Sequence, residues 1–384
     1  MERRDFLRVG VVGTAALQGA AAKRYRAAVI GHTGRGDYGH GWDTAWNGFD
    51  SIEVVAVADP VDAGRQAAMK RCGAPRGYRD YREMLSKEKP DLVSIGPRWT
   101  DQRREMVTAA AGAGCHIMLE KPFAATLADA DAMIEAVEKN HVKLQVGHQM
   151  RMAPSVRHVR HLIQSGAIGA IQEVRGRGKE DKRAGGEDLM VLGVHIFDVM
   201  RMMLGDPRWV FAHVTQEGRA IRRSDVHNAS EPVGPVAGDQ VAAMFAFDNG
   251  VHGYFGSKAS PRTDPKRFGY YFYGSEGVIY MPNGLESQPY ILRTPSWMPD
   301  EKHRWEKIEA PPDPADTKFE GRGLADTRMV RDLLMAIEEK RDPVCSARDG
   351  RWTIEMALAV YQSQRAGGPI EFPLKDRRHP LETL

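Results

Sequence analysis

Short apolar runs alternate with amphipathic stretches from Tyr25 to about Gly147, and this alternation constrains the fold more than any other feature of the chain. Each run has the length and uninterrupted apolar character of a strand buried on both faces. The runs are 27–30, 54–58, 92–95, 116–119 and 143–146. Between them lie helical signals, such as Thr126 before Leu127–Lys139, with Asp129 in the third helical position. Strands alternating with helices predict an α/β domain with a doubly wound parallel sheet over residues 23–148.

The second half of the chain has a different texture. Two helices are predicted at 155–165 and 188–204, and a charged, Pro-bearing excursion lies at 298–323. Separated runs rich in aromatic and β-branched residues follow the helices, at 210–215, 241–247, 250–257, 268–273 and 278–281. Asp248-Asn249-Gly250 marks a hairpin between two of these runs. We therefore expect an α+β domain over 149–350 with a large, mostly antiparallel open sheet, and a C-terminal helix and tail over 351–384.

A glycine-rich turn follows the first predicted strand directly. We expect Gly31, Thr33, Gly34, Arg35 and Gly36 to contact a dinucleotide, with N–H groups at the start of a following helix meeting its pyrophosphate. Thr33 replaces the usual middle glycine and puts a side chain where the phosphates pass.

An aspartate closes the second predicted strand. Asp59 is placed to accept hydrogen bonds from ribose hydroxyls and to repel a 2′-phosphate, which favours NAD over NADP. The alternative, a simple helix cap, is less consistent with the alternating elements around it. Together with the glycine turn, Asp59 predicts a Rossmann-type NAD site.

Glu120-Lys121-Pro122 follows the fourth predicted strand, at the carboxyl edge of the sheet where such folds bind ligands. A lysine there can donate to a substrate hydroxyl, and desolvation would shift its pKa toward neutrality for proton transfer. An isolated Lys-Pro would be a surface turn, but its position favours catalysis by Lys121.

The predicted helix 188–204 carries three ionisable groups on one face. Asp188, Val191, His195 and Asp198 follow helical spacing, so the face is interrupted only by Val191. By itself, His195 is equally consistent with a satisfied core histidine.

The ordered series of motifs over about residues 24–375 resembles the glucose-fructose oxidoreductase and inositol dehydrogenase family. The motifs are Glu120-Lys121-Pro122, Gly147-His148-Gln149-Met150-Arg151 with Pro154, Gly193-x-His195-x-x-Asp198, Asn249-Gly250, Gly274-Ser275-Glu276-Gly277, Asp349-Gly350 and the final helix around Tyr361. The resemblance implies a two-domain, NAD(P)-dependent enzyme acting on sugars, polyols or related alcohols. It implies acid–base roles for Lys121 and His195, and a cis peptide before Pro122.

The same resemblance extends the predicted site. We expect Pro97, Glu120 and Lys121 to contact the cofactor, and Gln149, Arg151, Lys179 and Asp198 to contact substrate. One position departs from the family, whose dehydrogenases usually carry a carboxylate where this chain has Val191. Valine cannot orient His195 by hydrogen bonding. Asp188 is the candidate replacement, with helix capping as the alternative.

The N-terminus resembles a twin-arginine export signal. Arg3 and Arg4 precede Phe6-Leu7, and a short apolar run leads to the small residues Ala20-Ala21-Ala22. Residues 1–22 therefore predict export to the periplasm, with an amphiphilic N-terminal helix as the alternative. The run is too short for a stable membrane anchor. Because free NAD should be scarce outside the cytoplasm, export also predicts a tightly bound cofactor.

Composition excludes several other classes. A net charge of +3 gives no indication of nucleic-acid binding, and three widely spaced cysteines imply no disulfide framework. His32, His40 and Asp43 do not suffice to predict a metal site. Three functions remain: an NAD-dependent carbohydrate oxidoreductase, which we favour; an NAD-retaining glycosidase that works by transient oxidation and elimination; and a non-catalytic nucleotide-binding protein. The family resemblance also implies homo-oligomers that associate through the exposed face of the second domain's sheet, where Phe245, Phe247 and Tyr254 would suit an interface.

Overall fold

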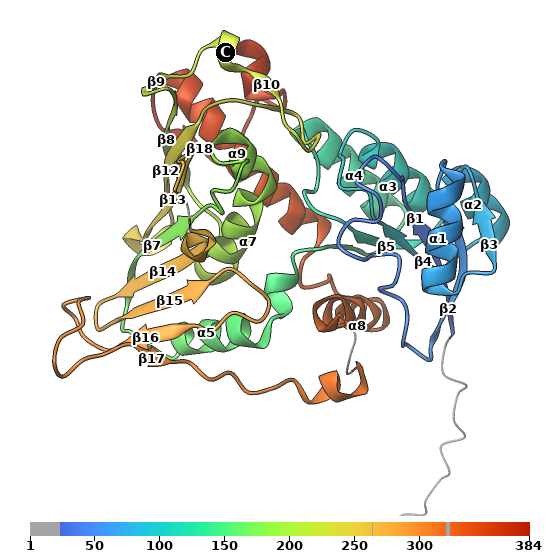
Figure 1. Ribbon diagram of the computed structural model, residues 1–384, viewed down its shortest axis with the longest axis horizontal. Helices are drawn as coiled ribbons and strands as arrows, with labels where there is room; N and C mark the ends of the chain where they lie inside the picture. The colour runs from blue at the N-terminus through green and yellow to red at the C-terminus, as the bar shows by residue number, and fades with distance from the viewer. Residues whose placement is uncertain (1–23, 263, 320–322) are drawn as a thin grey trace, which may run out of the picture.

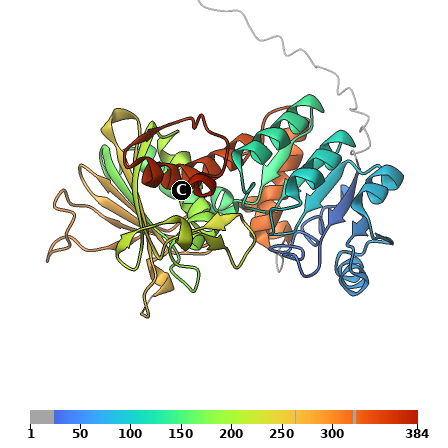
Figure 2. The same cartoon turned by 90° about the horizontal axis from the view of Figure 1, so that it is seen from above.

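Two domains lie side by side in the computed structural model, which describes residues 24–262, 264–319 and 323–384 (Figures 1 and 2). The predicted export signal, residues 1–22, lies outside the described residues. Within the described part of the chain, no helix is both long and apolar enough to span a bilayer.

The first domain contains a six-stranded parallel sheet in the order β3-β2-β1-β4-β5-β6. Its strands are β1 (Tyr25–Ile30), β2 (Ile52–Ala58), β3 (Arg76–Tyr78), β4 (Leu92–Ile95), β5 (His116–Leu119) and β6 (Leu144–Val146). Its helices are α1 (Asp62–Cys72), α2 (Tyr81–Glu88), α3 (Arg103–Gly112) and α4 (Leu127–Lys139). The predicted doubly wound sheet is confirmed. Only β3 was missed, because its three residues contain no apolar run.

Local sequence signals account for where some of these helices begin. The Thr126 side chain accepts a hydrogen bond from the Asp129 backbone N–H, which caps α4 as predicted. Asp80 caps α2 in the same way through the N–H of Arg82.

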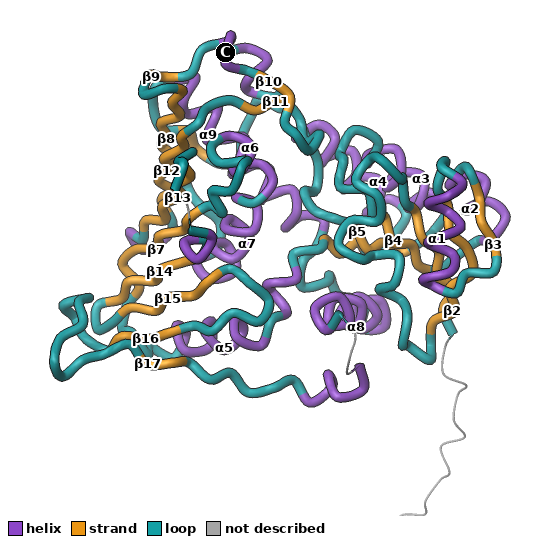
Figure 3. The backbone as a smooth tube through the Cα atoms, viewed as in Figure 1, coloured by secondary structure: helices purple, strands orange, loops and turns teal. Residues whose placement is uncertain are grey.

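The connection from β1 to β2 differs from the prediction. Residues 31–51 form successive turns and no helix, and they appear as loop in Figure 3. Glycines with positive φ recur here, at 34, 36, 39, 41 and 48. Such residues lose much conformational freedom in a helix and supply the left-handed turns of a compact loop. The expectation that a helix start after β1 would meet the pyrophosphate is therefore wrong.

The second domain is built on a ten-stranded mixed sheet, ordered β17-β16-β15-β14-β7-β13-β12-β8-β18, with β9 paired to β8. Its strands are β7 (Ile171–Arg177), β8 (Trp209–Gln216), β9 (Arg219–Ala220), β12 (Gln240–Ala246), β13 (His252–Lys258), β14 (Gly269–Gly274), β15 (Val278–Pro282), β16 (Tyr290–Leu292), β17 (Glu306–Lys307) and β18 (Ile370–Glu371); β10 (His227–Asn228) and β11 (Pro235–Val236) pair separately. The pairing of β7 with β13 is parallel, and the other pairings in this sheet are antiparallel. The predicted mostly antiparallel sheet is confirmed.

Helices of the C-terminal half cover one face of this sheet and reach the first domain. They are α5 (Pro154–Gln164), α6 (Gly186–Val191), α7 (Gly193–Leu204), α8 (Leu324–Glu338) and α9 (Ala347–Ala366). Short 3-10 helices are η1 (Gln149–Met152), η2 (Arg223–Asp225), η3 (Asp248–Gly250), η4 (Pro265–Arg267), η5 (Pro314–Phe319) and η6 (Pro380–Thr383). Helix α9 contacts α7 and β8 as well as α4, and α8 contacts β6. These two helices therefore tie the domains together (Figure 1).

The other face of the large sheet carries aromatic side chains without a helix over them. Phe211 is 45% exposed and Tyr271 is 39% exposed, and both border a hollow of about 700 Å³ together with Tyr254. Two residues predicted for this face lie elsewhere. Phe245 and Phe247 are buried, and Phe245 packs against Phe197 on the helix-covered side. Alternation along β12 and β13 places Phe245 and Tyr254 on opposite faces of the sheet.

The predicted single helix 188–204 is two helices. The first, α6, ends at Val191, and α7 begins at Gly193 after Leu192, whose φ of −116° departs from helical geometry. Asp188 and His195 therefore do not lie on one continuous helical face.

Candidate active site

Lys121 lies at the carboxyl end of β5, and the peptide bond to Pro122 is cis, as the resemblance implied. Arg103 of α3 supports this segment from below. It is 1% exposed, and its guanidinium donates to the carbonyl oxygens of Pro97 and Pro122. Pro97, expected at the cofactor, thus fixes Arg103 through its carbonyl group. Sequence reasoning missed Arg103, because an arginine in a helix normally lies on the surface.

Glu120 anchors the glycine-rich loop to the end of β5. Its carboxylate accepts hydrogen bonds from His40 Nδ1 at 2.9 Å and from Trp42 Nε1 at 2.7 Å. It also accepts from the backbone N–H groups of His40 and Lys121. Burial opposes ionisation, but the hydrogen bonds from His40 prevail and lower the pKa of Glu120 to about 2. We correct the expectation of a free cofactor ligand at Glu120, since its carboxylate holds the protein's own loop.

Lys121 and His195 come together from the two domains as ionisable groups without partners. Lys121 is 5% exposed, and its ammonium group has no hydrogen bond within the described residues. Burial lowers the pKa of Lys121, opposed by the nearby carboxylate of Glu120. Burial also lowers the pKa of His195, and the charge of Lys121 lowers it further. Both groups are thereby biased toward their neutral, proton-accepting forms.

A pocket of about 500 Å³ lies at the carboxyl ends of β1 and β2 and continues toward α2 and α3. Its lining is Gly31, His32, Ala58, Asp59, Pro60, Arg79, Asp80, Tyr81, Glu83, Gln102 and Met106. Dinucleotides bind in this position in open α/β sheets. The size and place of the pocket fit the adenosine half of NAD.

Asp59 lines this pocket, but its carboxylate is fully buried. It accepts hydrogen bonds from Thr33 N and Oγ1 at 3.0 and 2.7 Å, and from the Tyr38 hydroxyl at 2.8 Å. The N–H of Val61 also donates to it, at 2.8 Å. A carboxylate offers about four acceptor positions, and three of these donors share Oδ2. Binding of a ribose hydroxyl by Asp59 therefore stays a prediction. The oxygen concerned is Oδ1, since the other three donors share Oδ2.

Thr33 does not point where the sequence suggested. Its hydroxyl turns toward Asp59 and lies against Gly64 of α1, where an added Cβ would come 1.7 Å from Thr33 Oγ1. The absence of a side chain at Gly64 therefore leaves the space for Thr33. In the usual motif, a glycine at the position of Thr33 provides this space itself. Gly31 is equally constrained, because a Cβ there would meet the Tyr38 ring at 2.1 Å.

Arg98 follows β4 and lies against the glycine turn. A Cβ at Gly36 would come 2.4 Å from the backbone nitrogen of Arg98, so only glycine permits this approach. The Arg98 guanidinium has no ion pair within the described residues, and its buried Nε has no hydrogen-bond partner. Arg35, predicted at the cofactor, instead pairs with Asp101 and stacks on Trp99. Arg98 is thus a cation available to an anionic group beside the turn.

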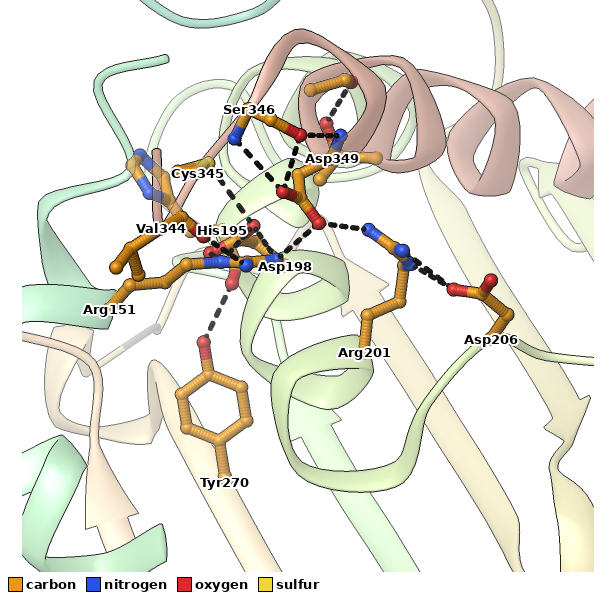
Figure 4. Close-up of polar contacts among 12 residues, drawn as sticks. Arg151, His195, Asp198, Arg201, Asp206, Tyr270, Val344, Cys345, Ser346 and Asp349 are labelled. Carbon is orange, nitrogen blue, oxygen red and sulfur yellow. Dashed lines mark hydrogen bonds and ion pairs between the residues drawn. The ribbon is translucent and has the colours of Figure 1, made fainter. Parts of the chain in front are cut away.

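Arg151 and Asp198, both predicted to bind substrate, pair with each other (Figure 4). Arg151 Nε lies 2.9 Å from both carboxylate oxygens of Asp198, and the two residues are 8% and 1% exposed. Arg151 also donates to the carbonyl of Val344 and pairs with Asp349. We correct the expectation for both residues: their polar groups join η1, α7 and α9 and are not available to a ligand.

The other predicted substrate and catalytic residues also have partners in the protein. Gln149 donates to Asp326 at 2.9 Å, and Lys179 pairs with Asp181 at 3.6 Å. Asp188 accepts from the Ser257 hydroxyl at 2.6 Å and from the N–H groups of residues 179 and 180. Asp188 therefore ties α6 to the ends of β7 and β13. It does not hydrogen-bond His195, so it does not replace the carboxylate absent at Val191.

The three residues considered as a metal set are also separated by their partners. His32 Nδ1 lies 2.9 Å from Gln102 Oε1, His40 pairs with Glu120, and Asp43 pairs with Arg71. Within the described residues, no group of three or more His, Cys, Asp or Glu side chains is arranged to hold a metal ion.

Comparison with known proteins agrees with this geometry. Residues 7–148 match the oxidoreductase family with an NAD-binding Rossmann fold, and residues 156–280 match the GFO/IDH/MocA C-terminal domain. D-apiose dehydrogenase of Paraburkholderia graminis is 29% identical, over 94% of this chain and 93% of that protein.

Solved structures share the fold. Levoglucosan dehydrogenase with NADH and levoglucosan has a TM-score of 0.73 at 21% identity, covering 92% of this chain and 100% of that one. Aldose-aldose oxidoreductase from Caulobacter crescentus has a TM-score of 0.70 at 20% identity, covering 91% and 100%. The prediction of NAD as cofactor is confirmed. The chain belongs to the GFO/IDH/MocA family of oxidoreductases and is an NAD-dependent enzyme of that family.

Proposed function

We propose that the protein transfers hydride between NAD and a CH–OH group of a sugar or polyol, with Lys121 and His195 as its acid–base residues. The observation that carries this proposal is the pairing of two bases without hydrogen-bond partners among the described residues, the buried Lys121 and the half-buried His195, whose pKa values burial lowers. The relatives named as D-apiose and levoglucosan dehydrogenases support the substrate class.

The chain's own residues divide the task between binding and proton transfer. The pocket beside Asp59 would hold the adenosine, and Arg98 would neutralise the pyrophosphate. Bound NAD⁺ supplies the hydride acceptor. A neutral Lys121 amine or His195 imidazole then takes the hydroxyl proton as the carbonyl forms, and returns it in the reverse direction. Burial lowers the pKa of both groups and so favours the neutral form that accepts a proton.

Export through a twin-arginine signal is part of the proposal. A periplasmic enzyme would have little free NAD to draw on, so the cofactor would stay bound and be regenerated by a second substrate. Fractionation of cells that express the full chain tests this point. Signal-dependent appearance in the periplasm supports export, and a lysine pair in place of Arg3 and Arg4 should abolish it.

A direct experiment tests the function itself. Purified protein is denatured, released nucleotide is identified by mass, and intact protein is incubated with pairs of sugars and with nitrophenyl glycosides. Bound NAD together with oxidation of one sugar and reduction of another supports the proposal. Release of free sugar from the glycoside without net NADH would favour the NAD-retaining glycosidase. Retained NAD without any turnover would favour the non-catalytic protein.

We also propose that the protein self-associates through the open sheet face. Exposed aromatic side chains there, including Phe211 and Tyr271, support it, since a soluble monomer rarely leaves such a patch uncovered. Light scattering tests it: Phe211→Lys should lower the measured mass, and an unchanged mass would contradict an interface at this face.

A further inference from the structure

Two histidines, His148 fully buried and His195 half-buried, meet beside Lys121, and three of their four ring nitrogens are buried without a hydrogen bond within the described residues. His148 follows β6 and is fully buried, and neither its Nδ1 nor its Nε2 has a hydrogen bond within the described residues. His195 near the start of α7 has a buried Nδ1 that also lacks a partner. Their rings meet edge to face, with centroids 5.2 Å apart and planes at 83°.

This arrangement is costly unless it is used. Leaving a buried polar group without a hydrogen bond destabilises a fold by about 1–3 kcal/mol, and most native structures avoid it. A histidine that served only to fill the core would normally have at least one nitrogen satisfied. Three buried nitrogens without partners in one ring contact therefore indicate groups that transfer a proton or bind a water molecule or the substrate.

The charged groups around the pair are few and mostly engaged. Asp198 and Arg151, which act on His148 with opposite signs, are bound to each other. Glu120 is held by His40 and Trp42. Burial lowers the pKa of His195, and the charges of Lys121, His148 and His40 lower it further. Among the described residues, no carboxylate hydrogen-bonds either ring, and the edge-to-face contact makes the two rings direct neighbours.

His195 needs an acceptor for one ring N–H in order to work as a base. In acid–base pairs, a group beyond the imidazole fixes its tautomer and stabilises the imidazolium that forms. Neither Val191, which is apolar, nor Asp188, which is bound to Ser257, can do this. The ring of His148 is in edge-to-face contact with the ring of His195 and has nitrogens without partners among the described residues.

We propose that His148 is the positioning residue of His195, accepting its Nδ1–H and sharing the proton that His195 gains. The contact forms through one bridging water or a small rotation of either ring. This inference rests on the proposed function. When a substrate O–H bond breaks and the carbon gives its hydride to NAD⁺, the proton goes to His195 Nε2. The Nδ1 proton of His195 can then pass to His148, so the single positive charge is shared between the two rings.

Three variants separate positioning from packing. His148→Leu keeps the bulk and removes the acceptor, His148→Gln keeps an acceptor that does not titrate, and His161→Gln on the exposed side of α5 is the matched control. We expect His148→Leu to lower kcat by about tenfold or more, within the range of general acid–base effects, with little change in KM or in the Kd for NAD. His148→Gln should recover part of that loss. The acid limb of the His148→Gln pH profile should move to higher pH, because His148 lowers the pKa of His195 and glutamine carries no charge.

A second readout does not depend on turnover. Nitrogen-15 spectra of the imidazole rings report the tautomer of His195 in the protein without substrate. We expect one tautomer, protonated at Nδ1, in the wild type and in His148→Gln, and a mixture in His148→Leu. Unchanged His195 signals and unchanged kcat in a folded His148→Leu variant would overturn the inference. If the wild type has no oxidoreductase activity, the spectra still decide whether His148 orients His195, so the two proposals fail separately.

Discussion

The two ends of the proposed cofactor site are built in opposite ways. At the adenosine end, the charged group is satisfied by the protein itself: Asp59 accepts four hydrogen bonds from Thr33, Tyr38 and Val61. At the catalytic end, Lys121 and His148 are buried, His195 is half-buried, and three ring nitrogens of the two histidines are buried without a partner within the described residues. Polar groups that are hydrogen-bonded within the protein form a rigid surface that recognises the shape of a ligand. Polar groups without partners are available for substrate contacts and proton transfer. The contrast shows where chemistry is expected, since the carboxylate at the adenosine end is hydrogen-bonded within the protein and the catalytic nitrogens are not.

We expect the largest effect on activity when the base Lys121 at the catalytic end is removed. Lys121→Met should lower kcat/KM by about 10²–10⁴-fold, since a positioned acid–base group contributes that much. The same variant should unfold at an equal or higher temperature, because a buried ammonium that lacks a partner is replaced by an apolar chain. Steady-state kinetics and thermal unfolding check both points. A fall in stability together with activity would mean that Lys121 is structural.

At the adenosine end, filling the space under Thr33 should damage the fold. Gly64→Ala puts a Cβ 1.7 Å from Thr33 Oγ1, and we expect a loss of about 1–3 kcal/mol in the free energy of unfolding, with weaker NAD binding. Gly112→Ala at the end of α3 is the matched control, since a Cβ there meets nothing within 4 Å. Adding Thr33→Gly to Gly64→Ala should recover part of the stability, because it removes the clash but also the hydrogen bond from Thr33 Oγ1 to Asp59. Equal stabilities of the Gly64 and Gly112 variants would show that this end is not tightly packed.

The exception at the binding end is Arg98, which lacks a partner like the catalytic groups. Arg98→Gln should weaken binding of NAD and of ADP-ribose by about tenfold, the loss of one charge-assisted contact, and leave adenosine binding unchanged. Arg304→Gln, an exposed position in the second domain, controls for net charge. Calorimetry gives the three affinities. If NAD affinity is unchanged while KM for the sugar rises, Arg98 binds substrate.

The smallest effect is expected at Asp326, which closes the site from α8. Burial raises its pKa to about 6, with a hydrogen bond from Gln149 opposing the shift. Because an ordinary aspartate has a pKa of about 4, the folded protein holds this proton more tightly than the unfolded chain. Stability from this group is present below about pH 4 and is lost as the pH rises through about 6. In Asp326→Asn, the free energy of unfolding measured by chemical denaturation should depend less on pH between those limits. An unaltered pH dependence would mean that Asp326 is ionised throughout.

The layered fold was readable from the sequence because its signals are local. Buried parallel strands give continuous apolar runs, and the Thr126 cap and the Asp248-Asn249-Gly250 turn act within a few residues. The missing helix after β1 had a signal too, since glycines 34, 36, 39 and 41 are closer together than a helix tolerates. The resemblance of this turn to a dinucleotide-binding motif led to the incorrect prediction of a helix there.

The site was only partly readable, because tertiary partners decide which charged groups are free. Lys121 and His195 were identified from their motifs. Arg151 and Asp198 belong to equally specific motifs, yet they neutralise each other. Arg103 lies in a helix whose sequence does not indicate that this arginine is buried. The role inferred for His148 depends on its contact with the ring of His195, which the sequence does not predict. No spacing rule connects residues that meet from two domains.

The most direct test is a single-turnover measurement on NAD-loaded protein, in which a panel of sugars is added and reduction of the bound nicotinamide is followed by absorbance. The wild type and Lys121→Met are compared at equal NAD occupancy. We predict that at least one sugar reduces the cofactor in the wild type, and that Lys121→Met retains NAD but reduces it at least about a hundredfold more slowly. Equal rates in the two proteins would contradict a catalytic role for the unpartnered bases.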